Sequence, residues 1–304
     1  ALQALLAAEQ PDLVLTYNWG AMDAALAHAV FRDYLSLPAL VHHEDGFNRD
    51  EAERLKPTRN WFRRVALARS AGLVVPSRRL EEIALKVWHQ PRGRVHLIEN
   101  GIDTARYAKR PKPDAMPRVV KRPGERWVGT LAGLRAVKNL PRLVRACADL
   151  PDEWHVVIPG EGPEREAIRA EAIRLGMAHR VHLPGFVADP STAVGLFDVF
   201  ALSSDSEQFP ISVVQAMAAG LPVAAPAVGD VAGMVAKENR PLISRPGDEG
   251  ALAQAIETLA LDEDLRERIG KANRDKALAC YDEARMIAAY RRLYASASGR
   301  QELA

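Results

Sequence analysis

The chain has 304 residues, of which 48% are hydrophobic and 26% are charged. This composition excludes an intrinsically disordered chain, and the length suits two domains that each bury a core of their own. No run of 18 apolar residues occurs, which argues against a transmembrane helix. Two cysteines, Cys147 and Cys280, are too few for a disulfide framework or a metal cage, so we expect reduced thiols in a cytoplasmic protein.

Charge is distributed unevenly along the chain. The net charge is only +2, but residues 54–126 contain 19 Lys or Arg against 6 Asp or Glu. Such a segment favours a surface that faces anionic partners, for which phospholipid headgroups, lipid diphosphates and nucleic acid are candidates. No zinc-finger spacing or aromatic-interleaved RNA-binding motif accompanies the charge, so nucleic acid is not expected as a partner.

Short apolar runs alternate with helical patterns in the first third of the chain, as in a parallel sheet with crossover helices. The expected strands are 12–16, 39–41 and 72–76, and residues 95–103 are expected to form a strand that runs into a turn at Asn100-Gly101. The expected helices are 20–34, 58–69 and 77–88. Residues 104–126 are polar and rich in proline, which indicates a linker.

A second alternating series follows this linker. Its expected strands are 127–131, 155–158, 181–183, 199–202 and 222–225. Its expected helices are 139–149, 163–175, 212–219, 249–260 and 263–279, with a last helix at 283–296. Asp248 and Asp262 stand where side chains cap the N-termini of the fourth and fifth helices of this series.

The stretch from Glu207 to Val223 is the most informative part of the sequence. An acidic residue in a loop is followed by a helix start at Pro210 to Ser212, and Gly220 suits the helix end. A carboxylate beside free helical N–H groups suits a ligand that carries both hydroxyls and phosphates, such as a nucleotide sugar. The alternative is an ordinary buried helix–turn–strand unit.

Further motifs occur along the chain and carry a resemblance. They are Asn100-Gly-Ile-Asp103, the loop from Gly129 to Asn139, Pro159-Gly-Glu-Gly162, Val181 to Phe186 and Val228 to Gly233. With the Glu207 stretch, they resemble the donor site of the family 4 retaining glycosyltransferases, which have the GT-B fold. The match is good over about residues 95–245 and weaker over the first hundred.

The resemblance implies an α/β fold of two Rossmann-like domains whose parallel sheets face each other across a cleft. Residues 1–112 would form the acceptor-side domain, with helix 283–296 packing back on it, and residues 113–282 the donor domain. The family's first strand and Gly-rich loop have no match here, so we expect the start of the N-terminal domain to be missing from this chain.

The resemblance also implies three catalytic residues. Lys138 would place a positive charge on the departing diphosphate, Glu207 would bind the donor sugar ring, and His42 would face the donor sugar and the acceptor. The alternatives for the histidine are His43 in the same role or a purely structural residue. Glu44 and Asp45 are carboxylates able to help activate an acceptor hydroxyl.

The donor-binding residues implied by the resemblance lie in three loops and one helix. They are Arg135, Gly133, Gly160, Phe209, Pro210, Ile211, Ser212 and Gln215. Arg135 stands further from the glycines than the family's arginine does. Gln215 replaces a family glutamate that accepts ribose hydroxyls, and a neutral amide weakens such bonds. We expect donor binding to be retained but weaker.

The implied function is transfer of a hexosyl unit from a nucleotide diphosphate sugar, as donor substrate, to a cell-envelope, lipid-linked or exopolysaccharide acceptor. No metal and no other cofactor is implied, since lysine, arginine and the helix dipole supply positive charge. The alternative is a GT-B-like nucleotide-sugar binding or regulatory protein with impaired catalysis. The basic, aromatic segment 57–69 predicts peripheral contact with an anionic membrane or, alternatively, a buried aromatic face with solvated arginines.

Overall fold

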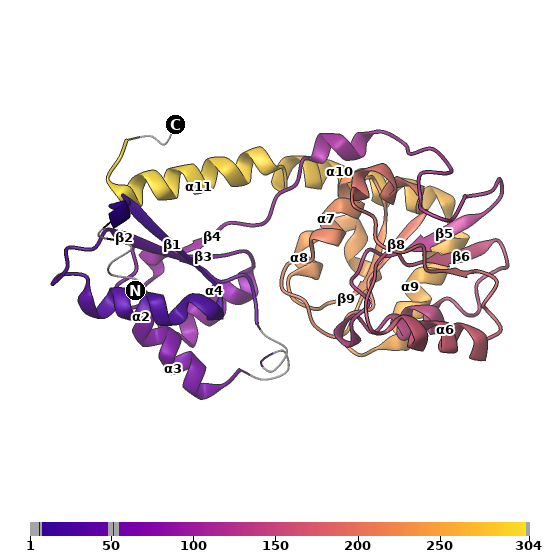
Figure 1. The fold of residues 1–304 in the computed structure, drawn as a ribbon. Coiled ribbons are helices and arrows are strands. Elements are labelled where there is room, and N and C mark those ends of the chain that lie inside the picture. Colours follow the sequence, from indigo (N-terminus) through magenta and orange to yellow (C-terminus); the bar gives the residue numbers. More distant parts are fainter. Residues whose placement is uncertain (1–5, 7, 48–50, 52–54, 302–304) are drawn as a thin grey trace. The chain divides into compact units, whose positions relative to one another are not determined.

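The computed structural model describes residues 6, 8–47, 51 and 55–301. The chain divides into two compact units, one of Ala1–Asn100 with Ala284–Ala304 and one of Gly101–Glu283 (Figure 1). The division falls after Asn100, so the proline-rich stretch expected to link two domains belongs to the second unit.

The first unit contains a four-stranded parallel sheet in which the strands follow chain order. The strands are β1 (Leu13–Tyr17), β2 (Ala39–His43), β3 (Gly72–Val75) and β4 (Val95–Leu97). They are connected by α2 (Met22–Phe31), α3 (Pro57–Ala66) and α4 (Arg78–Lys86). Proline at the first position of α3 and a Ser77 cap on α4, whose hydroxyl accepts from Leu80 N at 3.1 Å, explain where these helices begin.

Each face of this sheet has its own core. On the side of the connecting helices, Leu73 and Val75 pack with Met22, Leu80 and Trp88. The other side is covered by α11 (Glu283–Ser298), which returns to the first unit from the end of the second. Its apolar residues recur every three or four positions and pack against Val41, Val74 and Ile98; they are Met286, Ala289, Tyr290, Leu293, Tyr294 and Ala297.

The second unit contains a six-stranded parallel sheet of order β10-β9-β8-β5-β6-β7. The strands are β5 (Arg126–Gly129), β6 (Trp154–Val157), β7 (Val181–His182), β8 (Val199–Ala201), β9 (Val223–Pro226) and β10 (Ile243–Ser244). The strand order reverses between β5 and β8, which are neighbours. In open parallel sheets, ligands bind outside the carboxyl ends of the strands at such a reversal.

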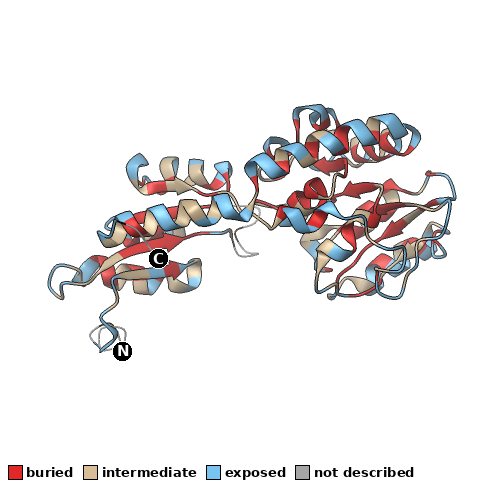
Figure 2. Cartoon of the chain, turned by 90° about the horizontal axis from the view of Figure 1, so that it is seen from above, coloured by how far each residue is buried: buried red, intermediate tan, exposed pale blue. Residues whose placement is uncertain are grey.

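Helices cover both faces of the second sheet, whose strands are buried between them (Figure 2). One core lies under α5 (Leu140–Ala146), α6 (Arg165–Arg174) and α9 (Glu249–Leu261). The other contains residues of α7 (Ile211–Ala218), α8 (Val231–Met234) and the end of α10 (Glu263–Cys280). Helix α10 approaches the end of α7 closely, since a Cβ on Gly270 would lie 2.0 Å from the Gly220 oxygen.

The expected elements are present within a few residues of their expected limits. The two predicted caps are confirmed, because Asp248 accepts from Ala251 N at 2.9 Å and Asp262 from Leu265 N at 2.8 Å. The short elements α8 and β10 were not predicted. Helix α8 has four residues and strand β10 has two, which is too short for a periodic apolar pattern to be recognised in the sequence.

Candidate functional site

The loops after β5 and β8 meet at the reversal of strand order in the second unit. Val128 pairs with Val199 in these strands, so the two loops emerge side by side. Lys138 Nζ lies 2.5 Å from Glu207 Oε1, and both side chains are largely buried. Ser204 Oγ donates to the same carboxylate oxygen at 2.6 Å. The structure thus joins the lysine and the glutamate that the sequence singled out.

A second set of contacts fixes this ion pair. Asn139 adopts a left-handed conformation, with φ of 44°, and its amide donates to Asp205 at 3.2 Å. Arg142 forms an ion pair with Asp205 at 2.7 Å. Ser203 Oγ donates to the carbonyl of Lys138 at 2.9 Å. These bonds tie the two loops together on either side of the Lys138–Glu207 pair, so its geometry is set before any ligand arrives.

The predicted glycines differ in what they do. A Cβ on Gly160, whose φ is 147°, would lie 1.8 Å from the Ala132 oxygen. Gly160 therefore allows the two loops to touch. A hydrogen bond also joins them, in which Leu134 N donates to the Glu161 carbonyl at 2.9 Å. Gly133 is exposed, and the nearest atom to its Cβ position is Arg135 Nε at 3.6 Å. Gly133 and Arg135 are thus neighbours on the surface of this loop.

Helix α7 begins directly after the Glu207 loop. Pro210 is its N-cap, and Ile211 and Ser212 open its first turn, where backbone N–H groups have no partner within the helix. Phe209 is buried against Tyr281, with ring centroids 5.6 Å apart. Phe209 therefore anchors the loop, while the N–H groups of the first turn remain for a ligand.

A glycine outside the predicted set supports the same loop. Gly229 has φ of 55°, and a Cβ there would lie 2.4 Å from the Gln208 oxygen. Asp230 N donates to that oxygen at 3.0 Å. The Glu207 loop therefore rests on the segment after β9. The sequence signal for it was the Val228 to Gly233 motif, which gave no role to this glycine.

Gln215 has a partner that sequence reasoning did not identify. Burial raises the pKa of Tyr107, and a hydrogen bond with the Gln215 side chain lowers it by a smaller amount. Tyr107 lies in a 3-10 helix, Thr104–Ala108, that follows the Asn100-Gly-Ile-Asp103 motif. The amide side chain is thus held by the segment that opens the second unit.

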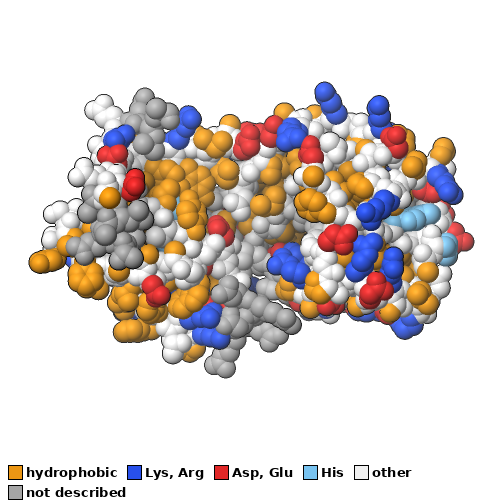
Figure 3. All heavy atoms as spheres, in the orientation of Figure 1, with side chains coloured by type: hydrophobic (Ala, Val, Ile, Leu, Met, Phe, Trp, Pro, Cys, Tyr) orange, Lys and Arg blue, Asp and Glu red, His pale blue; other side chains and the backbone are white. Residues whose placement is uncertain are grey.

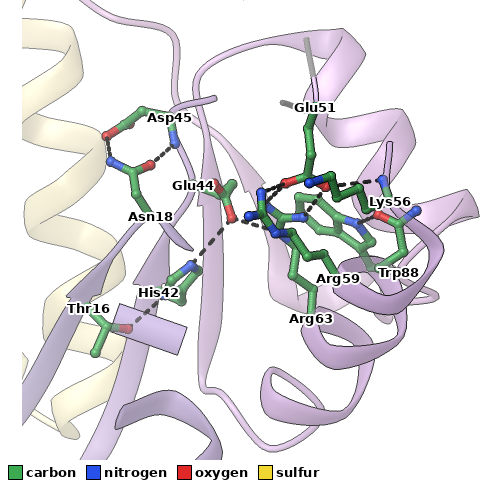
Figure 4. A network of polar contacts seen from close by, with 11 residues as sticks. Thr16, Asn18, His42, Glu44, Asp45, Glu51, Lys56, Arg59, Arg63 and Trp88 are labelled. Carbon is green, nitrogen blue, oxygen red and sulfur yellow. Dashed lines mark hydrogen bonds and ion pairs between the residues drawn. The ribbon is translucent and has the colours of Figure 1, made fainter. Parts of the chain in front are cut away.

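In the first unit, His42 is fully buried at the end of β2 (Figure 4). Its Nδ1 lies 2.8 Å from Thr16 Oγ1, and its Nε2 lies 3.8 Å from Glu44 Oε2. A carboxylate near Nε2 favours the tautomer protonated there, with Nδ1 accepting from the Thr16 hydroxyl. Among the described residues, His42 Nε2 and Glu44 Oε1 have no hydrogen-bond partner. A substrate-facing role for His42 stays a prediction.

Glu44 belongs to a buried chain of charges that ends on α3 (Figure 4). Arg63 donates to Glu44 at 3.0 Å and to both oxygens of Glu51, which also pairs with Arg59. The Arg63 guanidinium lies 5.0 Å from the Trp88 ring centroid. The alternative that all arginines of segment 57–69 are solvated is therefore wrong for Arg63, since desolvated guanidinium groups require such partners.

His43, the alternative to His42, is also buried. Its Nε2 lies 3.1 Å from the Tyr294 hydroxyl, and its ring stacks on Tyr17 with centroids 4.5 Å apart. Burial lowers the pKa of His43 to about 4, with a smaller contribution from His42 and an opposing one from Asp45. His43 is therefore neutral at physiological pH and packed between the sheet and α11.

Many cations of the basic segment are already paired with carboxylates. The pairs outside the Arg63 chain are Arg69–Asp33, Lys86–Glu82, Arg92–Glu81, Arg106–Asp189, Lys121–Asp198, Arg122–Glu125 and Arg126–Glu263. Among the described residues of the segment, these pairs therefore neutralise part of the charge excess. Figure 3 shows Lys and Arg side chains interspersed with Asp and Glu on the face of the second unit drawn there.

Neither a metal cluster nor a membrane-spanning helix is present in the described ranges. No three His, Cys, Asp or Glu side chains among them are grouped so that they would hold a metal ion. None of the helices placed by the structure is long and apolar enough to cross a membrane.

Comparisons with known proteins agree with this geometry. Residues 112–276 match the family described as glycosyl transferases group 1, and residues 1–106 match Glycosyltransferase Family 4. A 2-deoxystreptamine glucosyltransferase of Streptomyces kanamyceticus is 26% identical over 66% of this chain and 54% of its own length. The D-inositol 3-phosphate glycosyltransferase of Mycolicibacterium gilvum is 31% identical over 61% of this chain and 41% of its own.

Solved structures show the fold. Anabaena HepE in complex with UDP superposes with a TM-score of 0.80 at 22% identity, covering 98% of this chain and 81% of that one. Sucrose-phosphate synthase from Thermosynechococcus elongatus gives 0.80 at 24% identity, with 97% and 77% covered. The expected GT-B fold is confirmed.

The chain belongs to the glycosyl transferases group 1 family, whose model matches more than half of it. The chain spans about half the length of the curated relatives that it matches.

Proposed function

We propose that the protein is a retaining, metal-independent glycosyltransferase that moves a hexosyl unit from a nucleotide diphosphate sugar to a cell-envelope, lipid-linked or exopolysaccharide acceptor. The observation that carries this proposal is the Lys138–Glu207 pair at the reversal of strand order, directly before the N-terminus of α7. The 2-deoxystreptamine glucosyltransferase and a lipopolysaccharide core biosynthesis glycosyltransferase of Rhizobium meliloti support the reaction class, and HepE with UDP supports the donor.

In this proposal, Lys138 stabilises the departing diphosphate. Its ammonium group has three donors, so it can keep Glu207 and also bind a phosphate oxygen. The N–H groups of Ile211 and Ser212 add partial positive charge from the N-terminus of α7. Arg135, three residues before Lys138, is exposed. Fixed positive charge at the leaving group lowers the barrier, because negative charge develops there in the transition state.

Glu207 is proposed to bind the donor sugar. As a carboxylate it accepts hydrogen bonds from sugar hydroxyls and stabilises the positive charge that develops on the sugar ring. Gln215 is proposed to face the ribose. Its hydrogen bond to Tyr107 also favours a second candidate, a nucleotide-sugar binding protein without turnover, because the amide is partly committed to that phenol and lacks the charge of a carboxylate.

Release of nucleotide diphosphate from a panel of nucleotide sugars tests the proposal. The wild-type protein should release it from at least one donor, and Lys138→Ala should lower kcat/KM for that donor by roughly 10²–10³-fold. Lys271→Ala is the matched control, since Lys271 is an exposed lysine of α10. Binding without release would favour the second candidate, and neither binding nor release would contradict both.

The proposal also places the protein in the cytoplasm, in peripheral contact with the inner face of the membrane through α3. Trp61 is 65% exposed and Val65 is 39% exposed, one helical turn apart, and Arg64 is exposed beside them. A half-exposed tryptophan near a cation suits an anionic interface. Sedimentation with liposomes should increase with anionic lipid content and fall in Trp61→Ala, and binding indifferent to lipid charge would contradict the contact.

A further inference from the structure

A second polar site lies at the carboxyl ends of β1 and β2 in the first unit. Four consecutive ionisable residues end and follow β2, namely His42, His43, Glu44 and Asp45. The first three are buried, with exposed fractions of 0%, 2% and 0%. Asp45 is exposed. It is therefore the one member of this run that presents a charged group to a ligand.

Asn18 at the end of β1 holds Asp45 in place (Figure 4). Its side-chain oxygen accepts from Asp45 N at 2.7 Å, and its amide donates to Asp45 Oδ2 at 3.3 Å. Its own backbone N–H donates to the His43 carbonyl at 2.7 Å. These bonds keep Asn18 at φ of 55° and ψ of −176°, a conformation that costs on the order of 1–3 kcal/mol for a residue with a side chain.

The second carboxylate oxygen of Asp45, Oδ1, can accept hydrogen bonds from a ligand. Within the part of the chain that the structure describes, no side chain other than Asn18 is hydrogen-bonded to this carboxylate. An ionised carboxylate accepts about four hydrogen bonds. The site thus offers acceptors in a fixed orientation, at the strand ends where parallel sheets bind their ligands.

The aromatic ring of Tyr17 belongs to the residue directly before Asn18, on the strand that pairs with β2. Tyr17, the last residue of β1, is 50% exposed. Its ring stacks on His43, which in turn stacks on Tyr290 of α11 with centroids 5.6 Å apart. The Tyr17 ring is therefore supported from behind. Figure 3 shows hydrophobic side chains gathered over the sheet of the first unit.

We propose that Tyr17, Asn18 and Asp45 form a binding site for the acceptor, and that the acceptor group bound there is an uncharged, polyhydroxylated sugar. This inference rests on the proposed glycosyltransferase function. The Asp45 carboxylate accepts hydrogen bonds from sugar hydroxyls, and the Tyr17 ring packs against the C–H face of a pyranose.

The charge of the site selects the class of acceptor group. A phosphate or carboxylate would be repelled by Asp45. The nearby arginines of α3 do not offset this charge, because Arg63 and Arg59 are bound to Glu44 and Glu51. If the acceptor carries a lipid diphosphate, that group binds elsewhere, and a sugar residue occupies the Asp45 site.

An oligosaccharide array with neutral and anionic glycans tests the site directly. The wild-type protein should bind a subset of neutral glycans, and Asp45→Asn and Tyr17→Leu should each lower that binding at least tenfold. Tyr17→Phe should retain it, because the ring remains. Asp23→Asn is the matched control, since Asp23 is an exposed carboxylate of the same unit in the first turn of α2.

Titration with UDP by calorimetry separates this site from the donor site. Asp45→Asn should keep the UDP affinity of the wild type, and Lys138→Ala should lose UDP affinity while retaining glycan binding. Equal glycan binding by wild type and Asp45→Asn, binding of anionic glycans only, or no glycan binding by a protein that binds UDP would overturn the acceptor site. Failure to bind UDP would instead contradict the proposed function.

Discussion

Lys138 and Glu207 form an ion pair whose role differs between the free protein and the proposed donor complex. Without a donor, the two charges neutralise each other, and Ser204 adds a hydrogen bond to the carboxylate. Removal of the lysine leaves a largely buried carboxylate with fewer partners, which is costly. Each of these residues therefore has a structural and a proposed catalytic task, and variants need a stability measurement beside the kinetic one.

Replacement of Gln215 by glutamate tests the proposed ribose contact. Gln215→Glu should tighten nucleotide-sugar binding about tenfold, because hydrogen bonds to a carboxylate are about twice as strong as those to an amide. Calorimetric titration of both proteins with the donor measures the change. Tyr107→Phe is the control, since it frees the amide from its phenol partner without adding charge. Unchanged affinity in Gln215→Glu would sink the idea that this residue meets the ribose.

His43 should make the first unit sensitive to acid. The folded protein keeps His43 neutral down to pH about 4, whereas the unfolded chain takes up the proton near pH 6.5. The unfolded state therefore binds more protons between these values, and stability is lost as pH falls through this window. At pH 5 the loss is about 2 kcal/mol.

The variant His43→Gln isolates this contribution. It should lose about 2 kcal/mol less than the wild type between pH 7 and pH 5, as measured by urea unfolding at both values. The two proteins share every other ionisable residue, so the difference reports on this residue. Parallel losses in the two proteins would mean that His43 does not titrate as the structure indicates.

At the level of elements, contact between two loops decides how glycine variants behave. Gly160→Ala should destabilise the protein by more than about 2 kcal/mol, because its Cβ would overlap the Ala132 oxygen and its φ of 147° strains any side chain. Gly133→Ala, in the facing loop, would make only ordinary van der Waals contacts, the nearest at 3.6 Å from Arg135 Nε, and should cost less than about 1 kcal/mol. Thermal unfolding of both variants measures the contrast, and similar losses would count against this packing.

The periodicity of the sequence was enough to predict most elements, because strands such as Val199–Ala201 and helices such as Glu249–Leu261 have clear apolar patterns and caps. Motif order also singled out Lys138 and Glu207. The bracing by Asn139, Arg142 and Asp205 was not predicted, because it depends on which loops become neighbours. The burial of His42 was missed for the same reason, since nothing in the run His42 to Asp45 shows which side chain faces solvent.

At the level of the whole molecule, the chain passes between its two units twice, and these two connections run together. Ile102 N donates to the Tyr281 carbonyl at 3.0 Å, and Glu283 N donates to the Ile102 carbonyl at 2.9 Å. A Cβ on Gly101 would lie 2.8 Å from the Asp282 oxygen, which explains a glycine in the Asn100-Gly-Ile-Asp103 motif. The motif thus joins the entry and exit of the second unit.

The central claim is that Lys138 and Glu207 act as one donor site, and a double-mutant cycle on donor turnover tests it most directly. Lys138→Ala, Glu207→Gln and the double variant are compared by kcat/KM for the donor that the wild type uses. Residues that act as a unit show strongly non-additive effects. We predict that the double variant loses little more than either single one. Additive losses, or an unchanged rate in either single variant, would contradict the account.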